Sequence, residues 1–368
     1  MLAIQVLDVV LIVGGTVYCC AILWLVRGLY RPAPIRGNQL PSLSIIVAAR
    51  NEEQALPACL AALRQQDYAG IWEVIVVDDR SQDRTSALLA ETVDEWPQFR
   101  ALRAAEKPLF LCPKKSALAQ GIAVSKGEVL LFTDADCRPP ADWARSMAAY
   151  FVEGIGLVAG HAQPLGGRTF MQRLLAIDNL AVGALGAGSF AQGRPLSCTG
   201  RSLGYRRQVY DEVGGFESIG HLLGGDDVYF MRIVAKNTKW MQVFNRDAVV
   251  ECLPPPEKWQ DIIQQKMRHA AKGGHYGGAA LALAVLVYLF HCALGLGLGL
   301  VISGFAFPVS VIGVWALRWG VDALLLRCMA SECDGKWWFY LPALEVVYIP
   351  YVVFLASAGR LGLFRWKP

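Results

Sequence analysis

Residues 43–53 of the chain read LSIIVAARNEE. The first half of this stretch is apolar and rich in β-branched residues, and the stretch becomes polar from Arg50 onward. This pattern is typical of a buried parallel strand, over Leu43 to Ala48, that ends in a polar loop. Apolar side chains then recur at helical spacing over Leu56 to Leu63. The stretch therefore predicts a strand, a polar loop and a helix, in that order.

The same order recurs twice further along the chain. Apolar runs predict a second strand over Glu73 to Val77 and a third over Glu128 to Thr133. Helical spacing recurs in Asp83 to Val93 and in Ala117 to Ala123. Strands that alternate with helices predict an α/β fold with a parallel sheet. Because ligands of such sheets bind beyond the carboxyl ends of the strands, we expect the polar residues there to face one site.

Acidic residues follow the second and third predicted strands. Asp78 and Asp79 come after the second, and Asp134 and Asp136 come after the third. Two aspartates one residue apart suit a hard divalent ion such as Mg²⁺, which keeps water ligands and bridges to phosphates. An isolated Asp-x-Asp is more often a solvated turn, but this pair follows a buried strand. The chain has no glycine-rich dinucleotide fingerprint and no Walker-type loop, which argues against a dinucleotide cofactor and P-loop chemistry.

The composition argues against a purely soluble protein. Hydrophobic residues make up 54% of the 368 residues and charged residues 18%, and the mean hydropathy is +0.36. The apolar residues gather in Val9 to Val26, Gly277 to Leu317 and Trp337 to Ala358. An α-helix needs about 20 residues to cross a bilayer. We therefore expect an N-terminal anchor in residues 1–30, a water-compatible domain in residues 31–276, and about three hydrophobic segments in residues 277–368.

Charge predicts the orientation of this arrangement. Basic residues flank the middle domain at Arg27, Arg31, Arg36, Lys258, Lys266, Arg268 and Lys272. This bias predicts a multi-pass protein with the middle domain in the cytoplasm. Three crossings would leave the C-terminus outside, whereas the basic residues at 360–367 favour the inside, so its side stays open. The net charge of +4 gives no case for nucleic-acid binding, and ten cysteines without a Cys-x-x-Cys pair predict reduced thiols.

Eight short motifs together resemble those of the family 2 inverting glycosyltransferases with a GT-A nucleotide-sugar fold. They lie at residues 44–53, 76–85, 114–118, 132–136, 205–207, 213–216, 225–227 and 265–269. The last two resemble the membrane-embedded branch, which includes ceramide glucosyltransferase-like and carotenoid glycosyltransferases and the cellulose and hyaluronan synthases. The sequence departs from the usual pattern at Ala48, Arg50, Asp226 and His269, where proline, tyrosine, glutamate and tryptophan are more common.

The resemblance implies roles for the acidic residues. Asp227, with Asp226 beside it, would be the general base that removes the proton of the acceptor hydroxyl. The alternative is that this pair only caps the following helix. Asp136 with Asp134 would hold Mg²⁺ or Mn²⁺ against the donor diphosphate. Residues at the first and second strand ends would contact the uridine or its ribose, namely Glu52, Asp78 and Asp79.

The basic and polar motif residues have implied roles as well. Lys114 would reach a donor phosphate. Gln265 and Arg268 are three residues apart and share one helix face, where Arg268 would grip a phosphate and His269 would lie near the acceptor. The alternative is that this basic amphipathic stretch only lies on anionic lipid head groups.

The predicted function is transfer of a sugar from a UDP-sugar, with a metal and with inversion, to a lipid or lipid-linked hydroxyl. Two alternatives stay open. One is a processive polysaccharide synthase, which the Gln-x-x-Arg block favours. The other is a non-catalytic nucleotide-sugar-binding membrane protein, which the departures at Ala48, Arg50 and His269 favour.

Overall fold

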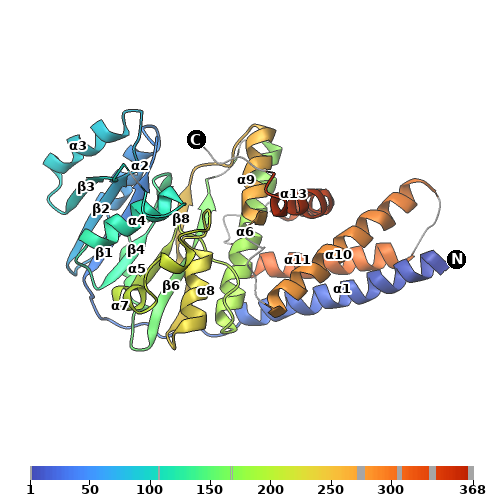
Figure 1. Cartoon of the computed structure of the whole chain (residues 1–368). Helices are drawn as coiled ribbons and strands as arrows, with labels where there is room; N and C mark the ends of the chain where they lie inside the picture. Colours follow the sequence, from blue (N-terminus) through green and yellow to red (C-terminus); the bar gives the residue numbers. More distant parts are fainter. Residues whose placement is uncertain are drawn as a thin grey trace. The chain divides into compact units, whose positions relative to one another are not determined.

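The computed structural model describes residues 2–106, 108–165, 167, 169–271, 278–304, 309–330 and 337–363 (Figure 1). Its internal contacts divide the chain into two compact units. The sheet unit comprises Arg31–Leu165 and Leu185–Leu253, and the helical unit comprises Met1–Tyr30, Gly166–Ala184 and Pro254–Pro368. The helical unit thus takes in two segments that the sequence-based division assigns to the middle domain. Lys272 and the terminal residues Arg365 and Lys367, which enter the charge argument, lie outside the described residues.

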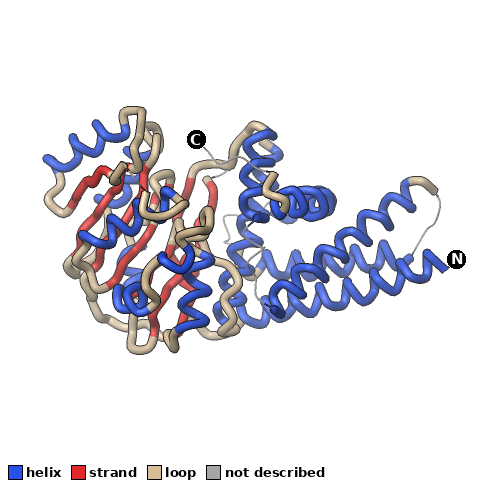
Figure 2. Tube along the Cα trace, viewed as in Figure 1, coloured by secondary structure: helices blue, strands red, loops and turns tan. Residues whose placement is uncertain are grey.

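The sheet unit contains one eight-stranded sheet with the strand order β3-β2-β1-β4-β7-β6-β8-β5 (Figure 2). Its strands are β1 Leu43–Ala49, β2 Trp72–Asp78, β3 Phe99–Arg103, β4 Val129–Phe132, β5 Cys137–Arg138, β6 Ile155–Pro164, β7 Leu203–Arg206 and β8 Met241–Cys252. Strands β3, β2, β1 and β4 run parallel, while β7 pairs antiparallel with both β4 and β6. The predicted α/β class is confirmed, and the three predicted strands are the neighbours β2, β1 and β4. The sheet is mixed rather than wholly parallel.

Helices cover both faces of this sheet. They are α2 Leu56–Arg64, α3 Thr85–Glu95, α4 Pro113–Val124, α5 Trp143–Ala148, α7 Arg207–Glu212, the 3₁₀ turn η1 Glu217–Ile219, and α8 Val228–Asn237. Val74 and Val76 of β2 pack in the main core, with residues of α2 and α5. Ile75 and Val77 face a second cluster with Ala117 of α4. The alternation follows from the two-residue period of a strand, and burial of both faces explains why β1 and β2 are almost continuously apolar.

The described part of the helical unit is built of helices, most of which are long and apolar, while α9 is amphipathic and α13 is short. They are α1 Leu2–Leu29, α9 Trp259–Ala271, α10 Gly278–Ile302, α11 Val309–Arg327, α12 Trp337–Pro350, the π-helical turn η4 Tyr351–Leu355, α13 Ala356–Arg360, and the first part of α6 Phe170–Ala191. Four helical stretches are long and apolar enough to cross a membrane: Gln5–Leu29, Phe170–Ala191, Leu281–Ile302 and Trp337–Gly359. Three of them match expected segments. The fourth, in α6, lies in the stretch that the composition assigns to the water-compatible domain.

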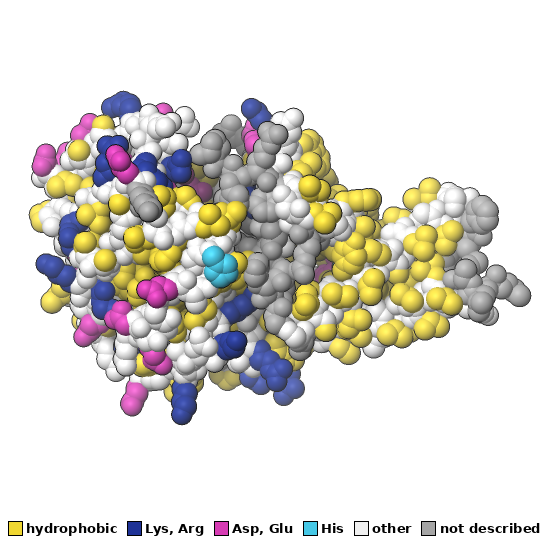
Figure 3. Space-filling view, viewed as in Figure 1, with side chains coloured by type: hydrophobic (Ala, Val, Ile, Leu, Met, Phe, Trp, Pro, Cys, Tyr) yellow, Lys and Arg dark blue, Asp and Glu magenta, His cyan; other side chains and the backbone are white. Residues whose placement is uncertain are grey.

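Small residues allow close packing inside the helical unit. A Cβ atom on Gly14 of α1 would lie 2.9 Å from Cδ2 of Phe290 in α10, and one on Gly15 would lie 2.9 Å from Cγ1 of Val314 in α11. Glycines at helix contacts let the backbones approach, which is how helices in a bilayer gain van der Waals energy. Many hydrophobic side chains on the outside of these helices are exposed, as Figure 3 shows in yellow. This surface suits lipid rather than water.

Candidate active site

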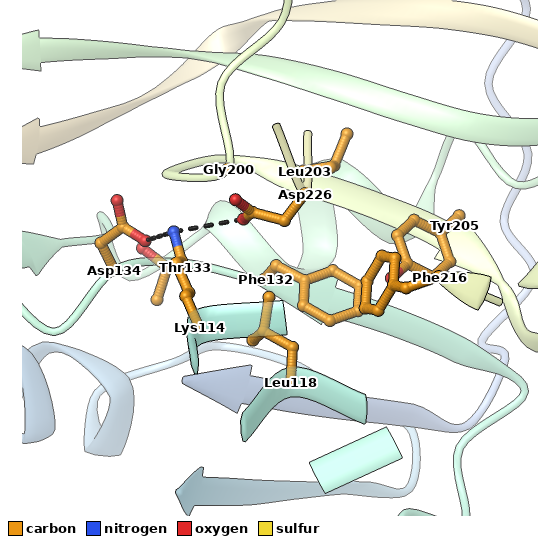
Figure 4. A pocket seen from close by; sticks show the side chains of 10 residues that line it. All are labelled: Lys114, Leu118, Phe132, Thr133, Asp134, Gly200, Leu203, Tyr205, Phe216 and Asp226. Atoms are coloured by element: carbon orange, nitrogen blue, oxygen red, sulfur yellow. Dashed lines mark hydrogen bonds and ion pairs between the residues drawn. The ribbon is translucent and has the colours of Figure 1, made fainter. Parts of the chain in front are cut away.

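A pocket of the sheet unit opens beyond the carboxyl end of β4. It is lined by Lys114, Leu118, Phe132, Thr133, Asp134, Gly200, Leu203, Tyr205, Phe216 and Asp226 (Figure 4). Lys114 lies in the first turn of α4, Asp134 follows β4, and Asp226 lies two residues before α8. Three segments far apart in the sequence therefore bring charged groups to one place, at the sheet edge where the strand pattern predicts a site.

The Lys114 ammonium lies between two carboxylates in this pocket. Its Nζ is 2.6 Å from Oδ1 of Asp134 and 3.2 Å from Oδ2 of Asp226 (Figure 4). Nε of Arg201 lies 3.8 Å from the other Asp134 oxygen. The side chains of Lys114 and Asp134 are 36% and 28% exposed, so solvent reaches them. We call Lys114, Asp134 and Asp226 the pocket triad.

The charges of the pocket triad support one another. Burial disfavours the Lys114 ammonium, but the carboxylates of Asp134 and Asp226 outweigh burial and raise the pKa of Lys114 well above its usual value. Burial likewise disfavours the Asp134 carboxylate, but Lys114 and then Arg201 outweigh it and lower the pKa of Asp134. Both groups are therefore charged at neutral pH, which suits binding of a charged ligand.

Asp227 has a different environment from its neighbour Asp226. It is the N-cap of α8: its Oδ1 accepts a hydrogen bond from the amide of Val228 at 2.7 Å, and its Oδ2 accepts one from the amide of Gly200 at 3.3 Å. Its exposure is 9%, and Asp226 rather than Asp227 lines the pocket. The capping role weighed for the pair is thus present at Asp227. The choice of Asp227 as the base stays a prediction.

The turn after β4 carries the expected metal ligands. The carbonyl of Asp134 accepts a hydrogen bond from the amide of Cys137 at 3.0 Å, which closes a turn containing Asp134 and Asp136. Both side chains are partly exposed. Among the described residues, no group of three or more His, Cys, Asp and Glu side chains is placed to hold a metal ion. Hard carboxylate oxygens with few protein ligands fit Mg²⁺ or Mn²⁺ that takes its other ligands from a diphosphate and water.

The acidic residues expected at the nucleotide lie at the same edge of the sheet. Asp78 ends β2, and the amide of Asp79 donates to the carbonyl of Ala49 in β1 at 2.7 Å. The Asp78 carboxylate accepts the Ser81 amide at 2.9 Å and the Ser86 hydroxyl. Nε of Arg80 donates to Asp79 at 3.0 Å. These bonds fix both carboxylates beside the adjoining β1 end.

Glu52 belongs to the loop after β1, and its amide donates to the Thr85 hydroxyl at 2.9 Å. The bond ties this loop to the start of α3. Since β2, β1 and β4 are adjacent parallel strands, Glu52, Asp78, Asp79 and the pocket triad follow neighbouring strand ends or approach them from α4 and α8.

The last predicted motif lies on α9, in the helical unit. Gln265 and Arg268 are one turn apart on this helix, as their spacing predicts. Burial lowers the pKa of Arg268, and Asp261 opposes that shift. The side chain of His269 lies outside the described part of the chain. The proposed roles of these three residues stay predictions.

The structure adds site residues that the sequence reading missed. Arg201 pairs with Asp134, and Phe132, Tyr205 and Phe216 line the apolar side of the pocket. Phe132 and Tyr205 stack with ring centroids 4.6 Å apart. Phe132, Tyr205 and Phe216 all lie in quoted motifs, so those motifs carried the signal. Nothing in the local sequence marks Arg201.

Comparison with known proteins agrees with this geometry. Residues 44–214 match the profile of the family described as Glycosyl transferase family 2. The chain is 29% identical over 236 residues to glycosyltransferase AglE of Haloferax volcanii. The aligned region covers 63% of the chain and 72% of that protein. It is 29% identical over 189 residues to a beta-monoglucosyldiacylglycerol synthase of Synechocystis, with 48% of the chain and 37% of that protein covered. The chain thus spans much less than half of this second relative.

A solved structure shows the same fold. The mannosyltransferase PcManGT of Pyrobaculum calidifontis, in complex with GDP-Man and Mn²⁺, superposes with a TM-score of 0.63 and 18% identity, over 96% of this chain and 99% of that one. At this identity the likeness establishes the GT-A-like fold. The profile match identifies residues 44–214 as a family 2 glycosyltransferase domain, and the relatives named as glycosyltransferases support a glycosyltransferase.

Proposed function

We propose that this chain transfers a sugar from a UDP-sugar to a hydroxyl of a lipid or lipid-linked acceptor, with a divalent metal and with inversion. The observation that carries the proposal is the pocket triad, in which two carboxylates and a lysine meet at the carboxyl end of β4. Such a transfer needs a carboxylate that binds the metal, a cation that binds the phosphates, and a carboxylate that contacts the acceptor hydroxyl.

Charged groups would bind the diphosphate of the donor. Asp134 and Asp136 would hold Mg²⁺ or Mn²⁺, which when bound stabilises the negative charge of the leaving diphosphate. Lys114 is within reach of the same space, and its ammonium would turn from Asp226 to a phosphate oxygen. Glu52, Asp78 and Asp79 would contact the uridine and its ribose.

The acidic pair Asp226 and Asp227 would supply the base. We keep Asp227 as the base, with Asp226 beside it in the lining of the pocket, and the two amide contacts of Asp227 would fix its orientation. The acceptor oxygen bonds to the anomeric carbon as the bond from that carbon to the diphosphate oxygen breaks. The hydroxyl proton passes to the carboxylate, and the nucleoside diphosphate leaves.

The rest of the chain supports a lipid acceptor. Four helical stretches are long and apolar enough to cross a membrane. One relative is named a beta-monoglucosyldiacylglycerol synthase, and this name supports a lipid acceptor. With the active site on the cytoplasmic side, as the basic flanks predict, Gln265, Arg268 and His269 of α9 would meet the acceptor at the bilayer surface.

The test uses membranes that contain the full chain. They are incubated with labelled UDP-sugars and GDP-sugars, since the solved relative holds GDP-Man, and with Mn²⁺, Mg²⁺ or EDTA. The proposal predicts metal-dependent label in the lipid extract from a UDP-sugar. A GDP-sugar as the only donor would overturn the nucleotide assignment, and transfer that continues in EDTA would overturn the metal.

Product size separates the alternatives. Label found only in high-mass polymer would replace the single transfer by a processive synthase. Binding of UDP without transfer to any lipid or saccharide in a broad panel would instead indicate a non-catalytic protein. A product with the donor's own anomeric configuration would contradict inversion.

A further inference from the structure

Lys115, next to Lys114 on α4, is a charged residue buried in the sheet unit. Its exposure is 0%, which is unusual for an ammonium group because removal of a charge from water is costly unless polar partners replace the water. Successive residues of an α-helix point about 100° apart. Lys114 therefore reaches the pocket, whereas Lys115 points to another part of the structure.

The partners of Lys115 lie in the segment that leads to the acidic pair. Its Nζ donates to the carbonyl of Ile219 at 2.5 Å and to the carbonyl of Leu222 at 2.9 Å. Ile219 ends the 3₁₀ turn η1, and Leu222 lies four residues before Asp226. The ammonium thus binds two carbonyl oxygens of one short loop, residues 219–223, and one of them, that of Ile219, also accepts the amide of Leu222 at 3.1 Å.

The turn between this loop and α8 is tightly constrained. Gly224 and Gly225 have φ angles of 70° and 73°, in the left-handed region that favours glycine. A Cβ on Gly225 would lie 2.1 Å from the ring of Tyr229. Tyr229 follows the acidic pair in the sequence, and the centroid of its ring lies 5.9 Å from Nζ of Lys115. Lys115 therefore contacts the chain both before and after Asp226 and Asp227.

A second connection joins the loop to the start of α4. The amide of Leu111 donates to the carbonyl of Gly220 at 3.0 Å, and the amide of Phe110 donates to the Ser116 hydroxyl at 2.8 Å. They hold the loop close to the helix, but they do not reach Leu222 or the acidic pair.

We propose that Lys115 is a positioning residue of the active site: its buried ammonium holds residues 219–223 so that Asp226 faces the pocket. Only the kinetic test of this inference rests on the proposed function, because hydrogen–deuterium exchange and acetylation do not measure activity. It assigns different tasks to two adjacent lysines, because Lys114 contacts the carboxylates of the pocket triad and Lys115 contacts the backbone that carries one of them.

The main test is hydrogen–deuterium exchange of the purified full-length protein. Lys115→Met keeps the length of the side chain and removes the ammonium, so we expect exchange in residues 217–229 to rise about tenfold, while β1 and β2 stay protected. Lys114→Met removes a partner of the Asp226 side chain rather than of the loop, so exchange in residues 217–223 stays unchanged, as it does in the exposed-lysine control Lys126→Met. Unchanged exchange in Lys115→Met, or an equal rise in Lys114→Met, would overturn the proposal.

A kinetic comparison adds a readout that general destabilisation would not give. We expect Lys115→Met to lower kcat for transfer about tenfold while the donor KM changes less than twofold, because the loop carries the acceptor side of the site. A rise in donor KM with unchanged kcat would contradict the assignment. Failure of the wild-type protein to transfer any sugar would sink the proposed function and leave the exchange result standing.

A labelling experiment on the wild-type protein covers the case in which Lys115→Met does not fold. Acetic anhydride is applied to the native protein, and acetylation of each lysine is measured by mass spectrometry. We expect Lys126 to react at least about tenfold faster than Lys115, because only Lys115 is buried and hydrogen-bonded. Equal reaction of the two lysines would overturn the proposal.

Discussion

The two units of the molecule each contain one cation between two carboxylates. In the sheet unit it is the pocket triad, Lys114 with Asp134 and Asp226. In the helical unit Arg318 of α11 lies 2.7 Å from Glu345 of α12 and 3.6 Å from Asp322, measured between nitrogen and oxygen atoms. We call these three the bundle triad. The Tyr18 hydroxyl of α1 donates to both Asp322 oxygens at 2.8 Å.

The difference between the triads is their access to solvent. Lys114 is 36% exposed, whereas the side chains of Arg318 and Glu345 are 2% and 5% exposed. Charge at the centre of apolar helices is stabilised only by fixed partners, because neither lipid nor apolar side chains replace water. The pocket triad is therefore free to exchange its partners for a charged ligand. The bundle triad instead holds helices together.

The largest expected effect is on catalysis in the pocket. Asp134→Asn removes the charge of a proposed metal ligand without changing its size, so we expect the transfer rate to fall about 10²- to 10⁴-fold. Steady-state assays with saturating metal check this, and Asp67→Asn is the control, since Asp67 is 72% exposed and paired only at the surface with Arg145. A wild-type rate in Asp134→Asn would remove the residue from the site.

Next in size is the loss of the cation from the bundle triad. Arg318→Met leaves two buried carboxylates without their cation, which we expect to lower the free energy of unfolding by about 3–5 kcal/mol. Thermal unfolding in detergent measures the change. Arg327→Met, at the exposed end of the same helix, is the matched control. If both variants melt at the wild-type temperature, the bundle triad does not hold the helices together.

A smaller effect is expected at Lys114. Lys114→Met removes a charged donor to the phosphates, so the donor KM should rise about tenfold, while the protein stays folded because Arg201 remains beside Asp134. Donor titrations check the KM, with Lys126→Met as the control. An unchanged KM would show that Lys114 serves only to pair the carboxylates.

The smallest effect is expected at Tyr18. Tyr18→Phe removes one hydroxyl donor from Asp322, while Arg318 remains, so we expect a loss of about 0.6 kcal/mol, the usual size for a hydrogen bond between membrane helices. The comparison uses the same thermal unfolding assay as for Arg318→Met. A loss as large as that of Arg318→Met would show that the hydroxyl, rather than the ion pair, carries the bundle triad.

The sequence predicted the half of the fold that is local and periodic. The predicted strand Leu43 to Ala48 differs by one residue from β1, because an apolar run with polar flanks marks a strand buried on both faces. The sequence does not predict strands β6 and β8, since 76 residues lie between the end of one and the start of the other and their pairing contains register shifts. The sequence does not predict α6 as an apolar segment, because Asp178 interrupts its apolar surface. The structure shows that Lys266 forms an ion pair with Asp178.

The site was predictable at the level of motifs and not of single side chains. Strand ends located Asp78, Asp79, Asp134 and Asp136, because parallel strands place their carboxyl ends together. Asp226 and Asp227 have different environments because they follow a turn whose two glycines have positive φ, and spacing alone does not give that geometry. Arg201 reaches Asp134 through tertiary packing, and its neighbours in the sequence carry no sign of this.

The most direct test measures rate and stability together in one variant of each triad. The account predicts that Asp134→Asn loses at least about 99% of the transfer rate while its Tm stays within about 2 °C of wild type. It predicts that Arg318→Met melts at a clearly lower temperature and keeps most of the transfer rate per folded molecule. Asp134→Asn with full activity, or Arg318→Met with unchanged Tm and no activity, would contradict the division of roles between pocket and bundle.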